Sequence, residues 1–344
     1  MGEFELLALL RSRLGMRSDR VLVGSGDDAA VVRPAGAVSV TSVDAFVENV
    51  HFRLATTSLD DLGHKSMAAG LSDLAAMGAE AGEAYLTVGL PDRLGERAVV
   101  ELADGAAALA REHGAVICGG DLTRAAELFV VVTVVGYAAS VAALATRAGA
   151  RAGDLLGVTG ALGGAGAGLL LLGRELPGID PRAGAQLRAR QRRPRPLLEA
   201  GRALAAAGVS AMIDVSDGIA SDTLRLCEQS GVGIDVHLDA LPADEGVAEV
   251  AMAAGVDPVE IVAAAGEDYE LLFTAAPDRQ DAIARVAADC GSPVTWIGSV
   301  RRTASDGEEG VRLLDGTGRP RRLAGWDHLR TGPARTGRPG PASR

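Results

Sequence analysis

The stretch VGSGDDAAVV, residues 23–32, places two neighbouring carboxylates, Asp27 and Asp28, after a Gly-Ser-Gly segment and before further apolar residues. Other aspartates share this setting, because each ends an apolar run or lies beside a glycine. They are Asp44 in VSVTSVD, Asp73 in GLSDLAAMG, Asp121 in VICGGD, and Asp214 and Asp217 in IDVSDG. Any one of them reads as a cap or turn residue, but the recurrence of the setting indicates a shared chemical role.

Carboxylates that converge in a folded protein cannot remain charged and unpaired. Cationic side chains near these motifs are too few to neutralise them, and the only lysine of the sequence is Lys65. Oxygen ligands select hard divalent cations such as Mg²⁺ or Ca²⁺. Mg²⁺ held by carboxylates usually shares its remaining positions with water and substrate phosphates. The pattern therefore predicts a site with several Mg²⁺ ions that binds a polyphosphate.

Several other function classes are excluded by the sequence. It contains no G-x-x-x-x-G-K-[ST] phosphate-binding loop and no protein-kinase signature set, while GGAGAG is only a weak match to a dinucleotide fingerprint. The net charge is −11 and no basic stripe with interleaved aromatics occurs, which argues against a nucleic-acid partner. ATP chemistry in this chain must therefore rely on metals and glycines.

The length of 344 residues, 48% of them hydrophobic, is enough for two domains with separate cores. We expect the boundary near RAGARAGD, with a domain over 1–150, a second over 151–330, and a Pro/Gly/Arg-rich disordered tail over 331–344. Two short strands are expected within 20–55. Helices are predicted over 61–82 and 95–114, and strands over 84–90, 115–121, 128–138, 211–218, 233–238, 269–275 and 294–300.

The sequence predicts a cytoplasmic protein without a membrane partner. Residues 1–15 read as an amphipathic helix and lack the features of a signal peptide. Residues 155–173 carry no charge and match a membrane span in length, but their glycines favour a strand, a glycine turn and a helix. The three cysteines are too scattered for a disulfide framework, which favours a reducing compartment.

Together these motifs resemble the thiamine-monophosphate kinases, a family in the superfamily of aminoimidazole ribonucleotide synthetase and selenophosphate synthetase. The resemblance runs from residue 2 to residue 329. The matching blocks are GSGDDAAVV, TSVDAFVENVHF, HKSMAAGLSDLAAMGAE, GGDLTR, TRAGARAGD, MIDVSDGIASD and GEDYELLFT. It implies an α/β (α+β) fold of two domains. The N-terminal mixed-sheet domain would pair into a homodimer around a β-barrel core, and the C-terminal domain would cover the nucleotide.

The resemblance also implies roles for individual residues and a reaction, the ATP-dependent phosphorylation of thiamine monophosphate to thiamine diphosphate. No residue is assigned as a general base. Metal ligands would be Asp27, Asp28, Ser42, Val43, Asp44, Asp73, Asp121, Asp214 and Asp217; ATP contacts would be Gly120, Asp121, Arg147 and Ser216; thiamine contacts would be His51, Glu267 and Trp326.

Two positions depart from the family pattern. Val43 stands where the family usually has Thr, so only its backbone carbonyl could bind a metal, and Gly70 stands where the family often has Asn. These departures put the exact coordination in doubt and leave every carboxylate in place.

Simpler interpretations of three residues stay open. His51 could be a partly buried histidine at a strand edge, Trp326 a core residue and Arg147 a surface residue.

Alternative functions are a metal-dependent phosphohydrolase, a non-catalytic nucleotide sensor or another ATP-using member of the superfamily. Intact carboxylates disfavour the sensor, and NVHF and GEDYE disfavour the hydrolase. A selenophosphate synthetase would have a reactive cysteine near its N-terminus, but the first cysteine of this sequence is Cys118. The hydrogenase-maturation protein ends in a functional cysteine, whereas this sequence ends in GPASR. Both relatives are therefore disfavoured.

Overall fold

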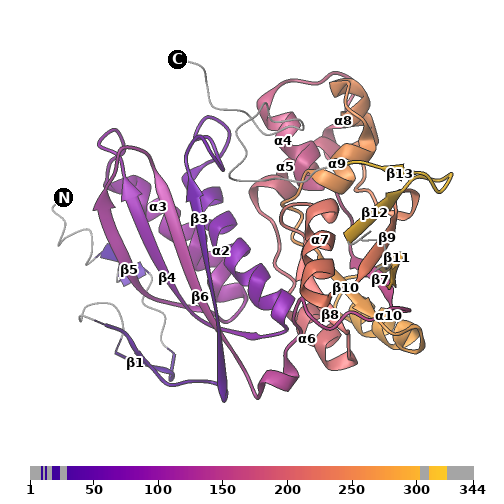
Figure 1. The fold of residues 1–344 in the computed structure, drawn as a ribbon. Helices are drawn as coiled ribbons and strands as arrows, with labels where there is room; N and C mark the ends of the chain where they lie inside the picture. The colour runs from indigo at the N-terminus through magenta and orange to yellow at the C-terminus, as the bar shows by residue number, and fades with distance from the viewer. Residues whose placement is uncertain (1–8, 11, 14–17, 24–28, 303–309, 324–344) are drawn as a thin grey trace. The chain divides into compact units, whose positions relative to one another are not determined.

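The computed structural model describes residues 9–10, 12–13, 18–23, 29–302 and 310–323. The chain divides into two compact units, each with its own sheet and helices (Figure 1). Among the described residues, the first takes in those up to Leu74 together with Ala79–Val141, and the second takes in Ala75–Gly78 and those from Ala142 to 323. The expected mixed α/β architecture of two parts is confirmed, while the exact boundary at residue 150 stays a prediction.

The main sheet of the first unit has four strands in the order β3-β6-β4-β5. β6 runs antiparallel to both β3 and β4, and β5 runs parallel to β4. β3 and β6 are rich in valine and threonine, whose branched side chains suit a pleated, half-buried surface. The bounds are β3 Val38–Val47, β4 Glu80–Leu90, β5 Val116–Arg124 and β6 Phe129–Ala138, and the separate hairpin is formed by β1 Val21–Val23 and β2 Val31–Val32.

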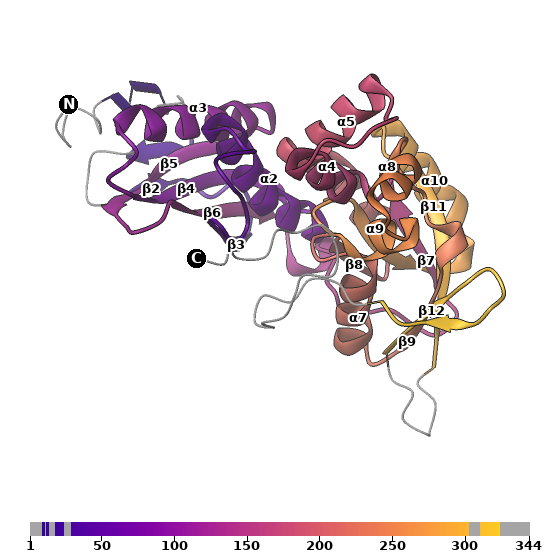
Figure 2. The same ribbon diagram turned by 90° about the horizontal axis from the view of Figure 1, so that it is seen from above.

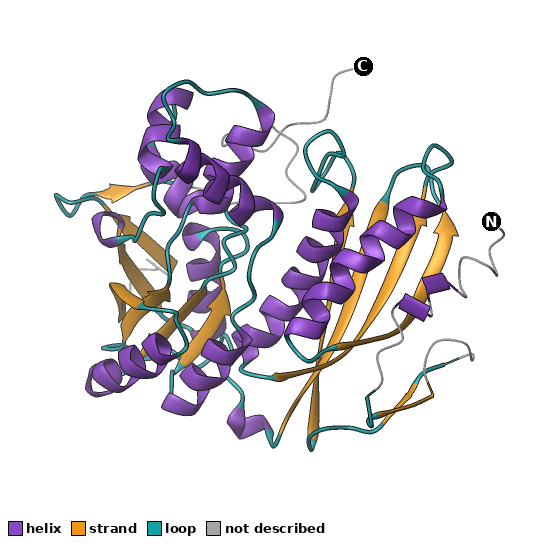
Figure 3. Ribbon diagram, turned by 180° about the vertical axis from the view of Figure 1, so that it is seen from behind, coloured by secondary structure: helices purple, strands orange, loops and turns teal. Residues whose placement is uncertain are grey.

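Helices α2, Leu59–Met77, and α3, Glu96–Glu112, cover one face of this sheet (Figure 3). The Ser58 hydroxyl accepts the backbone N–H of Asp61 at 3.1 Å and so caps the start of α2. A Cβ built on Gly63 would lie 1.9 Å from the carbonyl oxygen of Leu102 in α3, so glycine permits the two helices to approach closely. This packing holds α2, which carries Asp73, against the strands.

The opposite face of the four-stranded sheet is partly exposed. Val43 pairs in register with Thr133, which in turn pairs with Tyr85. Since successive side chains of a strand alternate between faces, Val43 lies on the side away from Ser42 and Asp44, and it is 61% exposed.

The second unit is built on a seven-stranded sheet in the order β13-β12-β9-β11-β7-β10-β8. All neighbouring strands are antiparallel except β12 and β9, which are parallel. The bounds are β7 Leu155–Thr159, β8 Ala211–Asp214, β9 Gly233–His237, β10 Leu271–Ala275, β11 Val294–Arg301, β12 Gly310–Leu314 and β13 Pro320–Arg321.

Helices pack against this sheet, as seen from above in Figure 2. α7 lies against β8, β9 and β12, and α10 lies against α6 and β11. Leu272 of β10 belongs to an aliphatic core that includes Ile219 of α7 and Ile261 of α9. The helix bounds are α4 Gly164–Gly173, α5 Pro181–Arg192, α6 Leu198–Ala207, α7 Ile219–Ser230, α8 Val247–Ala254, α9 Pro258–Ala264 and α10 Gln280–Asp289. Single-turn 3-10 helices are η1 Val141–Ala143, η2 Leu238–Ala240 and η3 Pro277–Arg279.

The strand predicted over 211–218 is too long, since β8 ends at Asp214. Two other predicted element boundaries are wrong for a backbone reason. The helix predicted over 61–82 ends at Met77, because Gly78 takes a left-handed φ of 69° and β4 begins at Glu80. The strand predicted from residue 269 begins at Leu271, because Tyr269 has a φ of 52°. The region 20–55 holds three strands instead of two, while the N-terminal helix lies mostly outside the described residues.

The uncharged stretch over 155–173 folds as predicted, with β7 followed by a glycine turn and α4. In the part of the chain that the structure describes, no helix has the length and apolar character needed to cross a membrane.

Candidate active site

One group of predicted ligands comes together in the first unit. Ser42 on β3 donates its hydroxyl hydrogen bond to the carboxylate of Asp73 on α2. Asp44 follows two residues later on the same strand and lies on the same face as Ser42. The strand and the helix thus bring three oxygen-bearing side chains to the helix-covered side of the sheet.

The glycine at position 70 has a packing reason in this chain. A Cβ built there would lie 3.0 Å from Cγ1 of Val134 and 3.5 Å from Cγ1 of Val132. The larger Asn that the family often carries would require these valine side chains to shift. The polar contact of that Asn is therefore replaced here by close packing of α2 on β6.

Gly120 and Asp121 lie at the other edge of the same sheet. Register pairing connects Asp44 to Val132, Val132 to Leu86, and Leu86 to Gly120. At about 4.8 Å per strand, Asp44 and Gly120 are about 14 Å apart along the sheet. One ion cannot bridge β3 and β5 over that span, so Asp121 would hold a different ion or a different part of the substrate from Asp44.

A second group of predicted residues lies in the second unit, at the turn between β8 and α7. Asp214 is the last residue of β8, and Ser216 and Asp217 follow before the helix begins at Ile219. Asp214 is 2% exposed and Asp217 is 7% exposed. Arg225, two turns into α7, forms an ion pair with Asp217. Burial of two carboxylates beside one arginine leaves this turn rich in negative charge.

Asp222 belongs to the same turn, although sequence reasoning assigned it no role. It lies in the first turn of α7, and its Oδ2 accepts the backbone N–H groups of Ser216 and Asp217, each at 3.0 Å. Burial, followed by the nearby charges of Asp214 and Asp217, raises the pKa of the Asp222 carboxyl well above its ordinary value. The sequence feature that could have pointed to Asp222 is its position at the end of the block MIDVSDGIASD, which also contains Asp214 and Asp217.

The loop GEDYE, residues 266–270, lies directly beside this turn. The backbone N–H of Glu267 donates to the carbonyl oxygen of Ser216 at 2.9 Å, and that of Tyr269 donates to the carbonyl oxygen of Val215 at 2.9 Å. Glu267 and Tyr269 both take left-handed φ angles, of 62° and 52°. Non-glycine residues in this region store strain, which is common at functional sites.

Glu267 is buried and contacts a residue that sequence reasoning missed. Nε2 of Gln191 on α5 donates to Oε2 of Glu267 at 2.9 Å, and both side chains are almost fully buried. No sequence motif marks Gln191, because its partner is 76 positions away. The contact fixes the carboxylate of the predicted thiamine ligand.

The two other acids of this loop anchor it to the fold. Asp268 accepts the backbone N–H groups of Gly163 and Ala165 at the start of α4, at 2.8 and 3.1 Å. Glu270 accepts the hydroxyl hydrogen of Thr159 at 2.7 Å and pairs with Arg190 at 3.1 Å. Burial raises the pKa of Asp268 to about 7, against the opposing effects of Arg190 and the backbone N–H groups.

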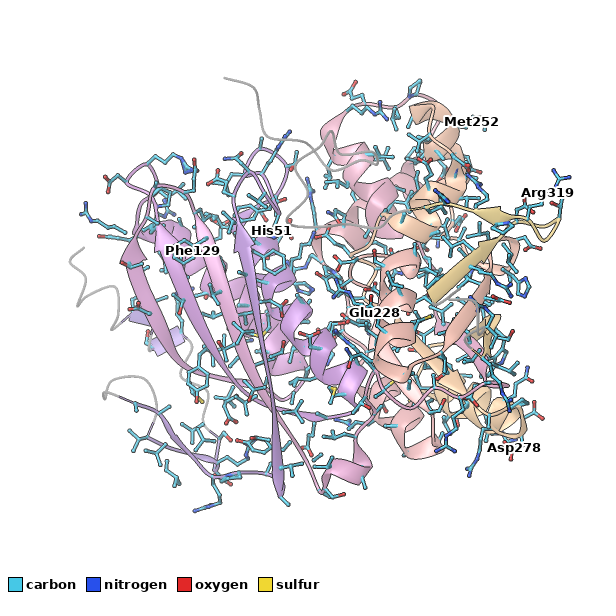
Figure 4. All side chains as sticks on the ribbon, in the orientation of Figure 1. His51, Phe129, Glu228, Met252, Asp278 and Arg319 are labelled. Atoms are coloured by element: carbon cyan, nitrogen blue, oxygen red, sulfur yellow. The ribbon has the colours of Figure 1, made fainter. Side chains whose placement is uncertain are left out.

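Two further predicted contacts lie in loops. His51, labelled in Figure 4, follows β3, and its Nδ1 accepts the backbone N–H of Val47 at 3.0 Å. Arg147 is exposed, and its carbonyl oxygen accepts the hydroxyl hydrogen of Ser230, the last residue of α7, at 3.0 Å. The predicted roles of both side chains stay predictions.

Three predicted site residues, Asp27, Asp28 and Trp326, lie outside the described residues. The hairpin strands that flank the first two are described, and Arg20 ties this hairpin to the sheet. Its guanidinium donates to Glu83 at 2.9 Å and lies over the ring of Tyr137, 4.7 Å from the centroid. The hydroxyl of Tyr137 completes the cluster by donating to Glu83 at 2.6 Å.

The donor set fits a hard divalent cation, since it consists of carboxylate and hydroxyl oxygens. Within the described residues, no group of three or more His, Cys, Asp or Glu side chains could hold a metal ion by itself. Mg²⁺ is typically bound by one or two carboxylates, with phosphates and water in the other positions. The separate groups Ser42/Asp44/Asp73 and Asp214/Asp217 match that mode of binding better than an all-protein cage.

Comparison with known proteins agrees with this geometry. Residues 26–138 match the family model of the AIR synthase related protein, N-terminal domain, and residues 151–309 match that of the C-terminal domain. A thiamine-monophosphate kinase of Rhodopirellula baltica is 37% identical over 87% of this chain and 89% of its own length. One from Mycobacterium tuberculosis is 39% identical over 79% of this chain and 80% of its own length.

The chain belongs to the thiamine-monophosphate kinase family.

Solved structures support the same membership. The crystal structure of the thiamine-monophosphate kinase from Stenotrophomonas maltophilia is 34% identical, with a TM-score of 0.79, over 91% of this chain and 96% of that one. A structure of AaThiL complexed with AMPPCP and TMP is 28% identical, with a TM-score of 0.75, over 95% of this chain and 97% of that one. The second unit of this chain, which holds the Ser216 turn and the GEDYE loop, is thus part of a fold that accommodates a nucleotide analogue and TMP in a relative.

Proposed function

We propose that this chain transfers the γ-phosphoryl group of ATP to the phosphate of thiamine monophosphate, giving ADP and thiamine diphosphate. The observation that carries the proposal is the pairing of two motifs. Glu267, the predicted thiamine contact, is hydrogen-bonded through its backbone to Ser216, the predicted ATP contact. Adjacent binding residues for acceptor and donor are what a direct transfer requires.

The acceptor phosphate needs no general base from the protein. Its second pKa is about 6, so it is mainly a dianion at neutral pH and already nucleophilic. The obstacle is repulsion between two anionic substrates. Bound Mg²⁺ would supply the positive charge that offsets this repulsion and stabilises the transferred group. The residues that would hold it are Asp44 and Asp73 with Ser42, Asp121, and Asp214 with Asp217, together with Asp27, Asp28 and the carbonyl of Val43.

The chain's own residues then position the substrates. Gly120, Arg147 and Ser216 would contact ATP, while His51, Glu267 and Trp326 would contact the thiamine moiety. Glu267 is suited to the cationic part of thiamine, because its carboxylate is fixed by Gln191 and by a strained backbone. A carboxylate held in place loses little entropy when a cation binds it.

We further propose that the first unit forms a homodimer around a β-barrel, built from the four-stranded sheets of two copies. Supporting this, the sheet face opposite α2 and α3 is partly exposed and carries Val43 at 61% exposure. Light scattering during size-exclusion chromatography of the full chain tests it, because a monomer would refute the pairing.

We place the protein in the cytoplasm on the strength of its three free cysteines.

The reaction is tested by measuring ADP and thiamine diphosphate together, with and without thiamine monophosphate. Equal amounts of both products, formed only when the acceptor and Mg²⁺ are present, are expected. ADP released at the same rate without acceptor would instead identify a phosphohydrolase. Nucleotide binding with no turnover would identify a sensor.

A further inference from the structure

Asp222 is a buried acidic residue beside the site to which neither the family resemblance nor the predicted reaction gives a role. It is 0% exposed, and one of its oxygens, Oδ2, accepts two consecutive backbone N–H groups, those of Ser216 and Asp217. A single oxygen that accepts two adjacent amides holds the backbone of a turn in one conformation. The turn it holds is the one that carries a predicted ATP contact and a predicted cation ligand.

The other oxygen of Asp222, Oδ1, is buried and has no hydrogen-bond partner among the described residues. A buried carboxylate with an unfilled oxygen is costly to the folded state, because that oxygen has lost its contact with water. Arg225 is the arginine that lowers the pKa of Asp222, but its own ion pair is with Asp217.

Asp214 and Asp217 are the charges that act most strongly on Asp222 after burial itself. Asp214 and Asp217 bring two buried carboxylates to this turn, and Arg225 pairs with Asp217. A divalent cation at Asp214 and Asp217 would offset their charge. Replacing a residue that is hydrogen-bonded to a metal ligand and holds it in place commonly lowers metal affinity 10–100-fold.

We propose that Asp222 is a positioning residue of the cation-binding turn, which fixes the backbone of Ser216 and Asp217 so that Asp214 and Asp217 bind a divalent cation. The inference rests on the proposed function in one respect, the use of Asp214 and Asp217 as cation ligands. Asp222 itself acts through the turn and does not contact substrate.

The experiment compares three variants of the full chain in Mn²⁺ titrations followed by electron paramagnetic resonance, which detects free hexaaqua Mn²⁺. Asp222→Ala removes the acceptor oxygen and the charge, while Asp222→Asn keeps one acceptor oxygen and removes the charge. Thr223→Val is the matched control, because Thr223 is the next residue, is also 0% exposed and has a buried hydroxyl for which the described part of the chain offers no partner. Valine has nearly the shape of threonine, so the control keeps the packing. Thermal unfolding of each variant gives the fraction that is folded.

Asp222→Ala is expected to weaken one class of Mn²⁺ sites of the folded protein at least about tenfold, and Asp222→Asn by a smaller factor, while ions held by Ser42, Asp44 and Asp73 bind as before. Thr223→Val should bind Mn²⁺ as the wild type does, within about twofold. Equal affinity of Asp222→Ala and wild type per folded molecule would refute the positioning role alone. A wild type that binds no Mn²⁺ would refute the cation site and the inference with it. The formation of thiamine diphosphate is measured separately, so failure of the proposed reaction is recognised as a different result.

Discussion

The backbone N–H of Glu267 donates a 2.9 Å hydrogen bond to the carbonyl oxygen of Ser216. A Cβ on the neighbouring Gly266 would lie 2.4 Å from that same carbonyl oxygen, so only glycine permits the contact. Gly266 also has a left-handed φ of 72°. The sequences IDVSDG and GEDYE, about 50 positions apart, are in this way joined into one structural feature. Any change that separates the two loops is expected to affect both substrates.

Gln191→Leu should weaken the binding of thiamine monophosphate. The change removes the donor to the Glu267 carboxylate, and a hydrogen bond to a charged group is worth about 1.5–3 kcal/mol. We expect KM for thiamine monophosphate to rise about tenfold while KM for ATP stays near the wild-type value. Steady-state kinetics with each substrate varied in turn measure both quantities.

Gln186→Leu is the control for that variant, because it makes the same change at an exposed position of the same helix. It should leave both KM values unchanged. If KM for both substrates rises equally in Gln191→Leu, the residue supports the whole loop pair and has no specific effect on Glu267.

Asp73→Asn should abolish transfer while leaving the fold intact. The amide keeps the shape of the side chain but loses the charge needed to bind a cation next to Ser42. Loss of such an electrostatic group costs at least about a hundredfold in kcat. Asp61→Asn, at the opposite end of the same helix and about 18 Å away, is the control and should retain activity. Near wild-type turnover of Asp73→Asn at saturating Mg²⁺ would show that Asp73 is no metal ligand.

Gly120→Ala should destabilise the first unit by about 1–3 kcal/mol. The added Cβ would lie 1.8 Å from the carbonyl oxygen of Leu86, so the two strands would have to move apart. Gly119→Ala is the control, since its Cβ would meet only Tyr85, at an ordinary 3.6 Å. Thermal unfolding should give a lower Tm for Gly120→Ala by several degrees and an unchanged one for Gly119→Ala. Equal Tm values would mean that β4 and β5 separate easily at Gly120.

Much of the fold and the types of site residue could be predicted from the sequence, because strand ends, glycine turns and carboxylates leave local signals. The strand and helix over 155–173 are an example. Contacts made across long separations could not be predicted. Gln191 meets Glu267 only because α5 packs beside the loop, and Asp222 is recognisable only when its two amide partners are seen. The left-handed backbone at Tyr269, likewise, is imposed by its hydrogen bond to Val215 and by no propensity of tyrosine.

Asp268 should make the second unit less stable as the pH rises from about 4 to 7. An unfolded aspartate titrates near pH 3.9, whereas burial raises the pKa of folded Asp268 to about 7. Between these values the folded state binds a proton that the unfolded state has lost, so the free energy of unfolding falls with rising pH.

Asp268→Asn removes this titration. Urea unfolding of both proteins at pH 5 and pH 8 should show the variant gaining about 1–3 kcal/mol relative to wild type on going to the higher pH. A difference between the two proteins that does not change with pH would mean that Asp268 is ionised throughout.

His51→Asn tests whether the acceptor phosphate attacks without a base from the protein. An imidazole in water titrates near pH 6.5 and the acceptor phosphate near pH 6, so either could produce the acidic limb of kcat. In the structure Nδ1 of His51 accepts the backbone N–H of Val47 at 3.0 Å, so this nitrogen is engaged within the protein. Asn can place its Oδ1 where Nδ1 was and keep this hydrogen bond. We expect the variant to bind thiamine monophosphate more weakly and to keep the shape of the acidic limb. Loss of the limb, or a shift by a full pH unit, would identify His51 as a general base. An acceptor with a lower second pKa gives an independent measurement, because the limb should then move down with the acceptor, and a limb that stays in place would implicate the protein.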